Sequence, residues 1–307
     1  MIGAGISGLV CARRLVAQGV QVLILEKSRS LAGRCASRKF GDHVVDSGVQ
    51  YFTLRNPVVR KEVQSVSDDQ LQTISPPVYE NGKIYREGEE RFYLAGGNNR
   101  FGKLLAEGLE VRKESEVRGV FPQGKKWEVA GELFDGVVSS APWPQSAALF
   151  GMIESEVAFE PNLTACLEYL IPWDGGRYAT LDSTGQDPLA WVGCENAKEG
   201  RIQKGKSVYV VQASTSYSRE HLEADPTWWI QDLQKRVEKE WGLDQEKRGA
   251  TFGHRWRYAR RGRGAPQPSA LADGLYLCGD SVTDSRVESV WQSGMEVAEK
   301  VLARGGP

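Results

Sequence analysis

The first 26 residues constrain the fold of this chain more than any other stretch. Three glycines follow a Gly-x-Gly-x-x-Gly pattern, and they are Gly3, Gly5 and Gly8. Apolar residues then recur at helical spacing as far as Val16, and an apolar, β-branched run over residues 20–25 ends in Glu26. This order predicts the end of a strand, a glycine turn, a helix, a second strand and an acid.

Each part of this pattern has a physical role in binding a dinucleotide. Gly3 permits a tight turn, Gly5 lets the backbone approach a pyrophosphate, and Gly8 allows close packing of helix and strand. The free N–H groups at the start of the helix, around Ile6–Ser7, attract phosphate. Glu26 lies where a carboxylate accepts hydrogen bonds from an adenosine ribose, and Lys27 follows it. The alternative is a plain strand-turn-helix unit with a solvated glutamate.

The strand before the glycines is unusually short. Only Met1 and Ile2 precede Gly3, whereas a strand usually has about five residues. We therefore expect a truncated first strand. Either the true start lies upstream and Met1 replaces an internal residue, or the chain is a shortened form.

Composition excludes several classes of protein. A length of 307 residues favours two domains, and a net charge of -1 gives no field that would attract nucleic acid or an anionic membrane. The five cysteines are scattered, the three histidines have no metal-ligand spacing, and no apolar run approaches about 20 residues. We expect a cytoplasmic or stromal monomer or weak dimer, without metal, membrane or nucleic-acid partners. Nine tryptophans suit a pocket for a flat aromatic ligand.

Two motifs after the acid resemble those of a known superfamily. Flavin amine oxidases carry a Gly-Gly-Arg motif and then an Asp-x-Gly motif near the flavin, and here the first is Ala32-Gly33-Arg34, with one glycine replaced. The string from Asp46 to Tyr51 resembles the version in renalases and their bacterial relatives. The resemblance implies that Arg34 contacts phosphate and that Gly48–Tyr51 lie beside the flavin of FAD. The alternatives are a surface arginine and ordinary strand packing.

The C-terminal stretch carries a second set of motifs. A predicted strand over residues 274–278 ends in Gly279-Asp280, and a helix follows from about Arg286. The string Arg286-Val287-Glu288, followed by Trp291-x-Ser-Gly, resembles bacterial renalase-like proteins. The resemblance implies that Asp280 holds the ribityl chain and that the helix N-terminus faces the flavin, where its dipole stabilises negative charge. For Asp280 the alternative is a helix cap.

The middle of the chain is less regular. Asn81-Gly82 predicts a hairpin, residues 226–241 predict a helix, and residues 136–142 predict a strand that ends at Ala141-Pro142. The resemblance places Val117 along the adenine, although a core valine is equally consistent. Residues 254–263 hold five arginines, which we interpret as an exposed loop. Alternatively, Trp256-Arg257 resembles a Trp-Arg pair of renalase-like sequences, and the resemblance implies that Trp256 lies by the flavin and that Arg257 contacts an anion.

Together these patterns predict an α/β protein with a Rossmann-like FAD-binding domain formed by residues 1–54, 96–145 and 264–307. Residues 55–95 and 146–263 are expected to form an α+β substrate domain over the flavin. The expected contacts of non-covalently bound FAD are Gly3, Gly5, Ile6, Ser7, Gly8, Glu26, Lys27, Gly33, Arg34, Gly48, Val49, Gln50, Val117, Ala141, Pro142, Gly279, Asp280, Arg286, Val287 and Glu288. The expected catalytic residues, which would line the substrate pocket, are Gln50, Tyr51, Trp191, Trp256, Arg257 and Trp291.

The resemblance implies a renalase-like oxidase. Such enzymes take hydride from aberrant dihydronicotinamide dinucleotides and reduce oxygen to hydrogen peroxide. An amine oxidase or desaturase of the same superfamily is the alternative enzyme. A non-catalytic binding protein with this fold is the alternative of another class, because fold alone does not determine function.

Overall fold

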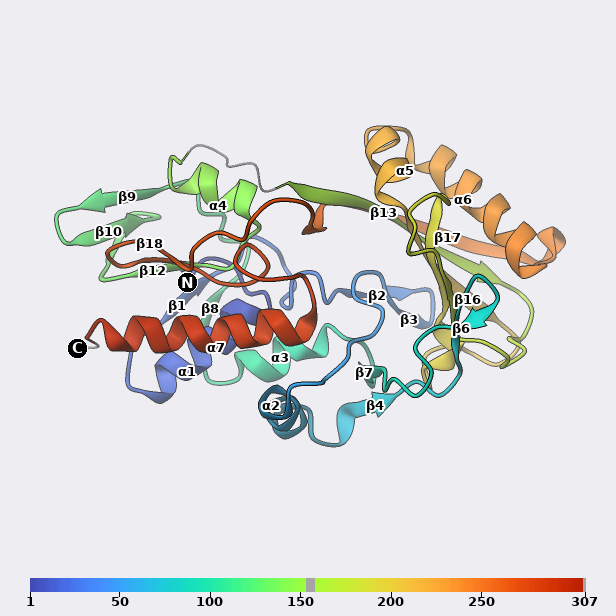
Figure 1. Ribbon diagram of the computed structural model, residues 1–307, viewed down its shortest axis with the longest axis horizontal. Coiled ribbons are helices and arrows are strands. Elements are labelled where there is room, and N and C mark those ends of the chain that lie inside the picture. Colours follow the sequence, from blue (N-terminus) through green and yellow to red (C-terminus); the bar gives the residue numbers. More distant parts are fainter. Residues whose placement is uncertain (153–157, 306–307) are drawn as a thin grey trace.

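The structure is a computed structural model that describes residues 1–152 and 158–305. Two layered parts lie side by side (Figure 1). One contains both chain termini and a small parallel sheet, and the other is built on a sheet of seven strands. The chain passes between the two parts several times, so each is assembled from separated segments.

The first part has a parallel sheet between a helical layer and a small antiparallel sheet. Ile2 bridges β1 on one side and β12 on the other, so the order is β8-β1-Ile2-β12-β19-β18. The elements are α1 (Ile6–Ala17), β1 (Leu23–Leu25), α3 (Arg100–Ala106), β8 (Glu110–Arg112), β9 (Val120–Gln123), β10 (Lys126–Val129), β11 (Glu132–Phe134), β12 (Val137–Ser139), α4 (Trp143–Leu149), β18 (Ala270–Ala272), β19 (Leu275–Leu277) and α7 (Val287–Ala303). Helices α1 and α7 cover one face, and β9–β11 cover the other. This layering confirms the predicted Rossmann-like α/β fold.

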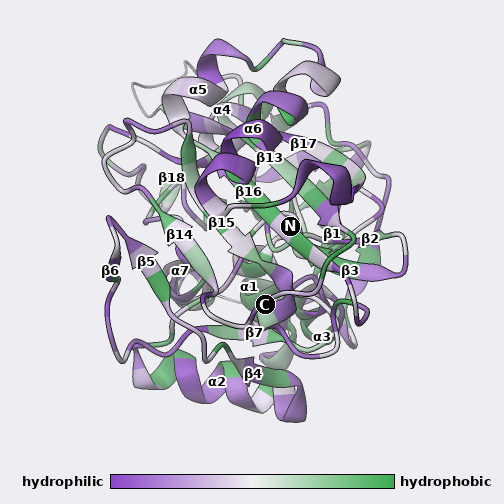
Figure 2. Cartoon of the chain, turned by 90° about the vertical axis from the view of Figure 1, so that its right-hand side faces the viewer, coloured by the Kyte–Doolittle hydropathy of each residue, from purple (hydrophilic) through white to green (hydrophobic). Residues whose placement is uncertain are grey.

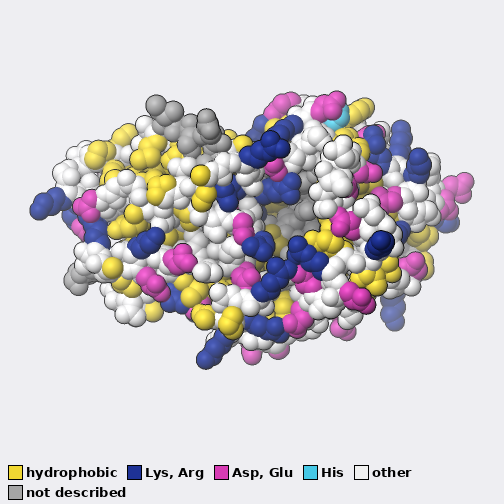
Figure 3. Space-filling model, in the orientation of Figure 1, with side chains coloured by type: hydrophobic (Ala, Val, Ile, Leu, Met, Phe, Trp, Pro, Cys, Tyr) yellow, Lys and Arg dark blue, Asp and Glu magenta, His cyan; other side chains and the backbone are white. Residues whose placement is uncertain are grey.

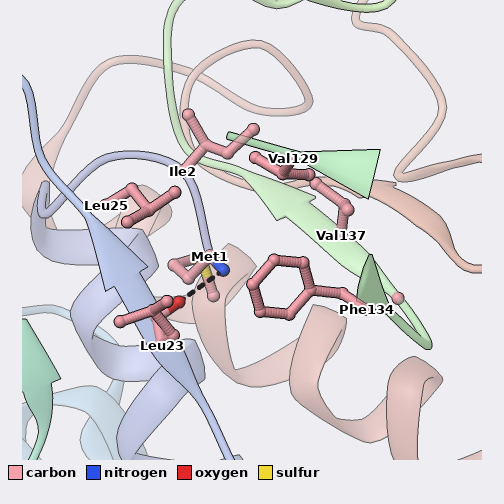
Figure 4. A pocket seen from close by; sticks show the side chains of 8 residues that line it. Met1, Ile2, Leu23, Leu25, Val129, Phe134 and Val137 are labelled. Carbon is pink, nitrogen blue, oxygen red and sulfur yellow. Dashed lines mark hydrogen bonds between the residues drawn. The ribbon is translucent and has the colours of Figure 1, made fainter. Parts of the chain in front are cut away.

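The N-terminal residues occupy the central position of this sheet. Ile2 N donates to Val138 O at 2.8 Å, and Gly3 N donates to Leu25 O at 2.9 Å. The amino group of Met1 donates to Leu23 O at 2.8 Å, and its burial lowers its pKa to about 6. Next to Met1, β1, β10, β11 and β12 enclose a small apolar cavity of about 10 Å³ (Figure 4). The short segment before the glycines is thus paired on both sides.

The second part has a mixed sheet of order β17-β13-β16-β15-β14-β5-β6. Its strands are β5 (Val78–Glu80), β6 (Lys83–Ile84), β13 (Phe159–Tyr169), β14 (Ala179–Leu181), β15 (Leu189–Cys194), β16 (Ser207–Ala213) and β17 (Arg248–Arg261). Helices α5 (Thr215–Glu220) and α6 (Pro226–Trp241) pack on one face through buried apolar side chains. In Figure 2, coloured by hydropathy, strands of this sheet are largely green and α6 is mainly purple. The other face turns toward the first part.

The remaining elements are short. They are β2 (Ser37–Phe40), β3 (His43–Asp46), α2 (Pro57–Ser67), β4 (Leu71–Thr73), β7 (Phe92–Leu94) and the 3₁₀ turns η1 (Asp68–Gln70), η2 (Glu195–Ala197) and η3 (Gln245–Lys247), of which η2 and η3 lie within the second part. The hairpin at Asn81-Gly82 and the helix over residues 226–241 are confirmed. Asn81 and Gly82 both have positive φ, as the predicted turn requires.

The structure differs from the expected boundary at residue 55. Helix α2 packs its buried Val59 and Val63 into the same core as α1, α3 and α7, so this helix lies with the first part. Only β5 and β6 of the 55–95 segment join the large sheet. Helix α2 is amphipathic, so its apolar face needs an apolar partner. The sides of α3 and α7 that α2 covers provide this partner.

Close packing of α1 against α7 depends on Gly294. A Cβ built on Gly294 would lie 2.4 Å from the backbone oxygen of Ser7 and 3.1 Å from Cβ of Val10. Alanine in a helix is ordinarily favoured over glycine by about 1 kcal/mol. Gly294→Ala should instead reduce the free energy of unfolding by about 1–3 kcal/mol, because the two helices must separate.

This prediction is checked by urea unfolding with Gly176→Ala as the matched control. A Cβ on Gly176 would have its nearest neighbour at 3.6 Å. A stability of Gly294→Ala equal to that of the unmodified protein would mean that the helices are not in close contact.

Candidate active-site cleft

A cleft of about 820 Å³ lies between the two parts of the molecule. This volume is in the range of small-molecule and cofactor sites. Figure 3 shows a hollow in this face with Lys and Arg side chains around it. The lining comes from the 48–55 segment, the loop 181–185, the strands β13, β15, β16 and β17, and the start of α7. Segments from both parts therefore form one site.

The glycine motif lies at the turn between Ile2 and α1. Gly3 has φ +88°, and a Cβ there would lie 2.7 Å from Oγ of Ser140, while a Cβ on Gly8 would lie 2.6 Å from Gly3 O. Both positions need glycine for the protein's own packing. A Cβ on Gly279 would lie 2.8 Å from Oγ of Ser7, so three distant segments meet at these glycines.

Gly5 is different, because neither its backbone conformation nor its packing in the protein requires glycine. Its φ is −71°, and a Cβ there would approach nothing in the protein closer than Ser140 Oγ at 3.9 Å. Gly33 lies next to Gly5, because a Cβ on Gly33 would be 3.5 Å from the Cα of Gly5. The open space at Gly5 fits a ligand pressed against the backbone, which is the role that the sequence pattern predicts.

Glu26 is buried next to the same turn. One carboxylate oxygen accepts from Ala4 N at 2.7 Å and the other from Ser28 N at 2.8 Å. Each oxygen retains a lone pair for a further donor such as a ribose hydroxyl. Lys27 is exposed. Glu26 thus holds the glycine turn and the following loop together.

Ala141 and Pro142 lie at the turn after β12, on the far side of Gly3. A Cβ on Gly3 would lie 3.8 Å from Ala141 N, and Pro142 is the residue before α4. Val117 is buried in an apolar cluster with Ile2 and Leu25, as a core valine would be. The structure therefore brings Ala141 and Pro142 to the glycine turn, and it packs Val117 into the core on the other side of β1.

Arg34 links three elements at the edge of the cleft. Its guanidinium makes a bidentate ion pair with the buried Asp280, at 2.5 and 2.6 Å, and its Nη1 donates to Ala259 O at 3.2 Å. Ser285 Oγ donates to Asp280 at 2.8 Å. Arg34 lines the cleft, whereas Asp280 lies just behind it. The phosphate contact expected of Arg34 and the ribityl contact expected of Asp280 stay predictions, and the structure shows the two side chains paired with each other.

The 48–51 segment forms one wall of the cleft. Gly48, Val49, Gln50 and Tyr51 all line it. A Cβ on Gly48 would lie 2.0 Å from Arg34 O, so no other residue fits there. Gln50 is buried, its Nε2 donates to Gly48 O at 3.2 Å, and its Oε1 has no partner in the described residues. That orphaned acceptor is suited to a donor on a bound ligand.

Tyr51 and Trp191 form an aromatic wall. Their ring centroids are 5.5 Å apart, and Tyr178 packs behind both. Burial raises the pKa of Tyr51, so its hydroxyl stays neutral at physiological pH. These flat apolar surfaces suit a planar ligand.

Strand β17 places Trp256 and Arg257, two neighbouring residues predicted to line the site, on opposite faces. Trp256 lines the cleft, and its Nε1 donates to Ser47 O at 3.1 Å. Arg257 points to the opposite face, where it pairs with the exposed Glu223, and it does not line the cleft. Successive side chains of a strand face opposite sides, so Arg257 cannot share the position of Trp256. The anion contact predicted for Arg257 needs another residue, and Arg260 does line the cleft.

The predicted residues at the start of α7 likewise lie partly in the cleft and partly outside it. Arg286 and Val287 line the cleft, while Glu288 accepts a hydrogen bond from Asn56 N at the outer side. Trp291 is buried, and its Nε1 donates to Glu62 at 2.9 Å. Trp291 is thus a core residue one turn along the helix rather than a wall of the cleft.

Sequence analysis missed much of the cleft rim. Six arginines and three carboxylates line the cleft, including Arg55, Arg86, Arg219, Glu89, Glu160 and Asp182. Most of these come from loops or from the ends of strands. No short-range spacing identifies them, although the many arginines of residues 254–263 are one available signal.

A buried charge cluster supports the wall from behind. Asp46 accepts from Lys198 Nζ at 2.8 Å and from Arg201 Nη1 at 3.0 Å, and Glu195 pairs with the same two bases. All four side chains are at most 1% exposed. Burial alone would raise the pKa of Asp46, but the two bases hold it below its usual value. Asp46 therefore remains charged and fixes the start of the 46–51 segment.

Among residues 1–152 and 158–305, no helix is long and apolar enough to span a membrane. The same ranges contain no group of three or more His, Cys, Asp and Glu side chains arranged to hold a metal ion.

The fold and the glycine turn define a protein with a Rossmann-like dinucleotide-binding domain. Residues 1–65 match the family model of the NAD(P)-binding Rossmann-like domain.

Known structures share the fold of the whole chain. A protein from Exiguobacterium sp. 255-15, named only provisionally as a protoporphyrinogen oxidase, superposes with a TM-score of 0.80 at 12% identity over 98% of this chain and 97% of that one. Reduced UDP-galactopyranose mutase gives 0.79 at 11% identity over 100% and 95%. A triple mutant of putrescine oxidase gives 0.72 at 10% over 99% and 98%. At these identities the likeness shows the fold alone.

The open space at Gly5 leads to a prediction that separates ligand binding from folding. Gly5→Ala should change the apoprotein's free energy of unfolding by less than about 1 kcal/mol, because its Cβ meets no protein atom closely. The same methyl group would meet a pyrophosphate on the backbone and should weaken FAD binding at least about tenfold.

Melting of the apoprotein and fluorescence titration with FAD measure the two effects. Gly8→Ala serves as the contrast, since its Cβ would clash with Gly3 O and destabilise the apoprotein as well. Unchanged FAD affinity in Gly5→Ala would show that no ligand approaches this turn.

His254 gives a prediction about pH. Its ring packs on Trp256 at 4.2 Å, its Nδ1 lies 3.3 Å from Nη2 of Arg38, and burial together with the positive Arg38 lowers its pKa to about 4 from 6.5. The unfolded chain binds a proton as the pH falls through about 6.5, whereas the folded chain does so only near 4. Stability should therefore be lost as the pH falls through this window.

The loss should be on the order of 1 kcal/mol, because the ring is partly exposed and its charge is screened. Chemical unfolding between pH 4 and 7 measures it. His254→Gln should flatten the slope in this window, and His221→Gln controls for removal of a histidine. An identical slope in His254→Gln would rule out His254 as its source.

Proposed function

We propose that this chain is an FAD-dependent oxidase of the renalase-like kind. In this reaction a dihydronicotinamide dinucleotide of aberrant isomeric form loses a hydride. Molecular oxygen takes up the two electrons and the proton of that hydride, together with one proton from solvent, to give hydrogen peroxide. The partners are therefore a small-molecule hydride donor and oxygen.

The charge of the cleft is the observation that carries this proposal. Six arginines face three carboxylates among its lining residues, next to the aromatic wall of Tyr51 and Trp191. A dinucleotide combines a flat ring with a negatively charged pyrophosphate and matches both features. A monoamine substrate carries a positive charge and offers no anionic group to these arginines.

The residues of the first part fit FAD. Glu26 and the turn at Gly5 would hold the adenosine and pyrophosphate, and Arg34 with Asp280 would hold the central part of the cofactor. Val287, at the start of α7, faces the cleft, so the helix dipole would favour negative charge there. When bound, FAD would supply the redox chemistry, because a flavin can accept a hydride and pass its electrons to oxygen.

The protein's own residues would orient the substrate and exclude water. Tyr51 and Trp191 would stack the nicotinamide, and the orphaned Oε1 of Gln50 can accept a hydrogen bond from a ligand. Trp256 closes the wall on the side of β17. The proposed reaction is a hydride transfer, which needs no proton abstraction from the donor, and the hydroxyl of Tyr51 stays neutral because burial raises its pKa.

Non-covalent binding is part of the proposal. The five cysteines are all buried, and none lines the cleft among the described residues. Burial raises the pKa of Cys278 to about 12, so this thiol is a poor nucleophile.

A non-catalytic binding protein is the alternative from another class. Such a protein need not keep open space at Gly5 or an orphaned polar atom at Gln50, and both are present. An amine oxidase or desaturase of the same superfamily remains the alternative enzyme, and the charge of the rim argues against the amine oxidase.

Anaerobic mixing tests the proposal. The flavin-loaded protein should bleach much faster with isomeric dihydronicotinamide dinucleotides than with monoamines, and admission of air should then yield hydrogen peroxide. Absorbance at the flavin band and a peroxide assay are the measurements, with ordinary NADH as the control donor. Rapid bleaching by a primary amine without any response to a dinucleotide would move the assignment to the amine oxidases.

A further inference from the structure

Arg219 is the only cleft-lining arginine that lacks a partner within the described residues. Each of the other five makes an ion pair: Arg34 with Asp280, Arg55 and Arg86 with Glu89, Arg260 with Glu160, and Arg286 with Asp284. Arg219 is exposed and forms no ion pair and no hydrogen bond with residues 1–152 or 158–305. Its positive charge is therefore not compensated by the protein.

Arg260, Thr215 and Ser216 line the same end of the cleft as Arg219. Thr215 lies four residues earlier on α5 and thus on the same face of the helix. Nη2 of Arg260 donates to Oγ1 of Thr215 at 3.1 Å, which places the second arginine beside this face. Ser216 also lines the cleft, and its Oγ lies 3.2 Å from that of Ser214.

The nearby carboxylates are already satisfied. Glu160 accepts from Arg260 Nε at 2.8 Å and from Thr215 Oγ1 at 3.0 Å. Asp182, on the 181–185 loop, accepts from the backbone of Thr184 and Asp187 in its own turn. Neither carboxylate pairs with Arg219, so the guanidinium is free for an external anion.

We propose that Arg219, with Arg260 and the hydroxyl of Ser216, forms a phosphoryl-binding subsite at this end of the cleft. The inference rests on the proposed function and deepens it, since it names the group by which the dinucleotide is anchored. Guanidinium groups bind phosphoryl oxygens in a bidentate manner, and serine and threonine hydroxyls complete such sites. The phosphoryl group belongs either to the pyrophosphate or to a 2′-phosphate on the adenosine ribose.

Calorimetric titration of the FAD-loaded protein with non-reacting ligands tests the subsite. The ligands are ADP-ribose, 2′-phospho-ADP-ribose and inorganic pyrophosphate, and the variants are Arg219→Ala and Arg219→Lys. The alanine variant should bind roughly tenfold more weakly, and lysine should restore part of the affinity. In turnover with a dihydronicotinamide isomer, Arg219→Ala should raise KM more than it lowers kcat.

Arg236→Ala is the matched control. Arg236 is a partly exposed arginine on the neighbouring α6, where it pairs with Asp232, and it does not line the cleft. Its removal takes the same charge from the same part of the molecule. Equal weakening by Arg236→Ala and Arg219→Ala would overturn the subsite and leave only a general field effect.

The ligands separate the remaining outcomes. Equal weakening for both ADP-ribose forms supports a pyrophosphate contact, and weakening confined to the 2′-phosphorylated form supports a 2′-phosphate contact. Unchanged binding of all three ligands by Arg219→Ala overturns the subsite while the proposed function stands. If the unmodified protein binds pyrophosphate through Arg219 but neither ADP-ribose, the proposed function fails and the subsite stands. If it binds none of them, both fail.

Discussion

The buried charge cluster of Asp46, Glu195, Lys198 and Arg201 joins the start of the 46–51 wall to the segment after β15, and the position of that wall of the cleft depends on it. Two acids and two bases lie fully out of water, and the ion pairs connect the end of β3 to the segment after β15. Leaving one such charge unpaired costs about 3–5 kcal/mol, whereas an apolar replacement of the whole cluster can be neutral. The cluster therefore constrains geometry more than it adds stability. It does so directly behind the segment that carries Gln50 and Tyr51.

A second constraint is the close approach of backbones at the glycine turn. Gly3, Gly8, Gly279 and Gly294 each leave no room for a Cβ, because another segment's backbone or side chain occupies that space. Three separated parts of the chain meet there, so the position of the Gly279-Asp280 turn is set by contacts with α1. This explains how Asp280 comes to face Arg34, which lies 246 residues earlier in the chain. The fold thus places the ion pair without help from local sequence.

Local elements of the fold could be predicted from the sequence, whereas the lining of the cleft could be predicted only in part. The glycine turn, the hairpin at Asn81-Gly82 and helix α6 follow from short-range periodicity and turn chemistry, which act within a few residues. Arg257 shows the limit, because the resemblance marks a Trp-Arg pair while the alternation of a strand sends the two side chains to opposite faces. Burial of Trp291 could not be predicted either, since both a core and a pocket favour a large aromatic ring. The rim arginines come from separate loops and are related only by the folded structure.

The arrangement of charge around the cleft combines these constraints. Five rim arginines are held in place by carboxylates, which reduces their net attraction for ligands but fixes their side chains. Preorganised groups lose less conformational entropy when a ligand binds, so paired arginines contribute orientation. An unpaired arginine contributes charge instead, and near a partly enclosed cleft this charge is screened less than on an open surface. A cleft with both kinds of arginine can therefore attract an anion at one end and hold a neutral ring at the aromatic wall. A substrate with a charged linker and a flat reacting group requires both of these sites.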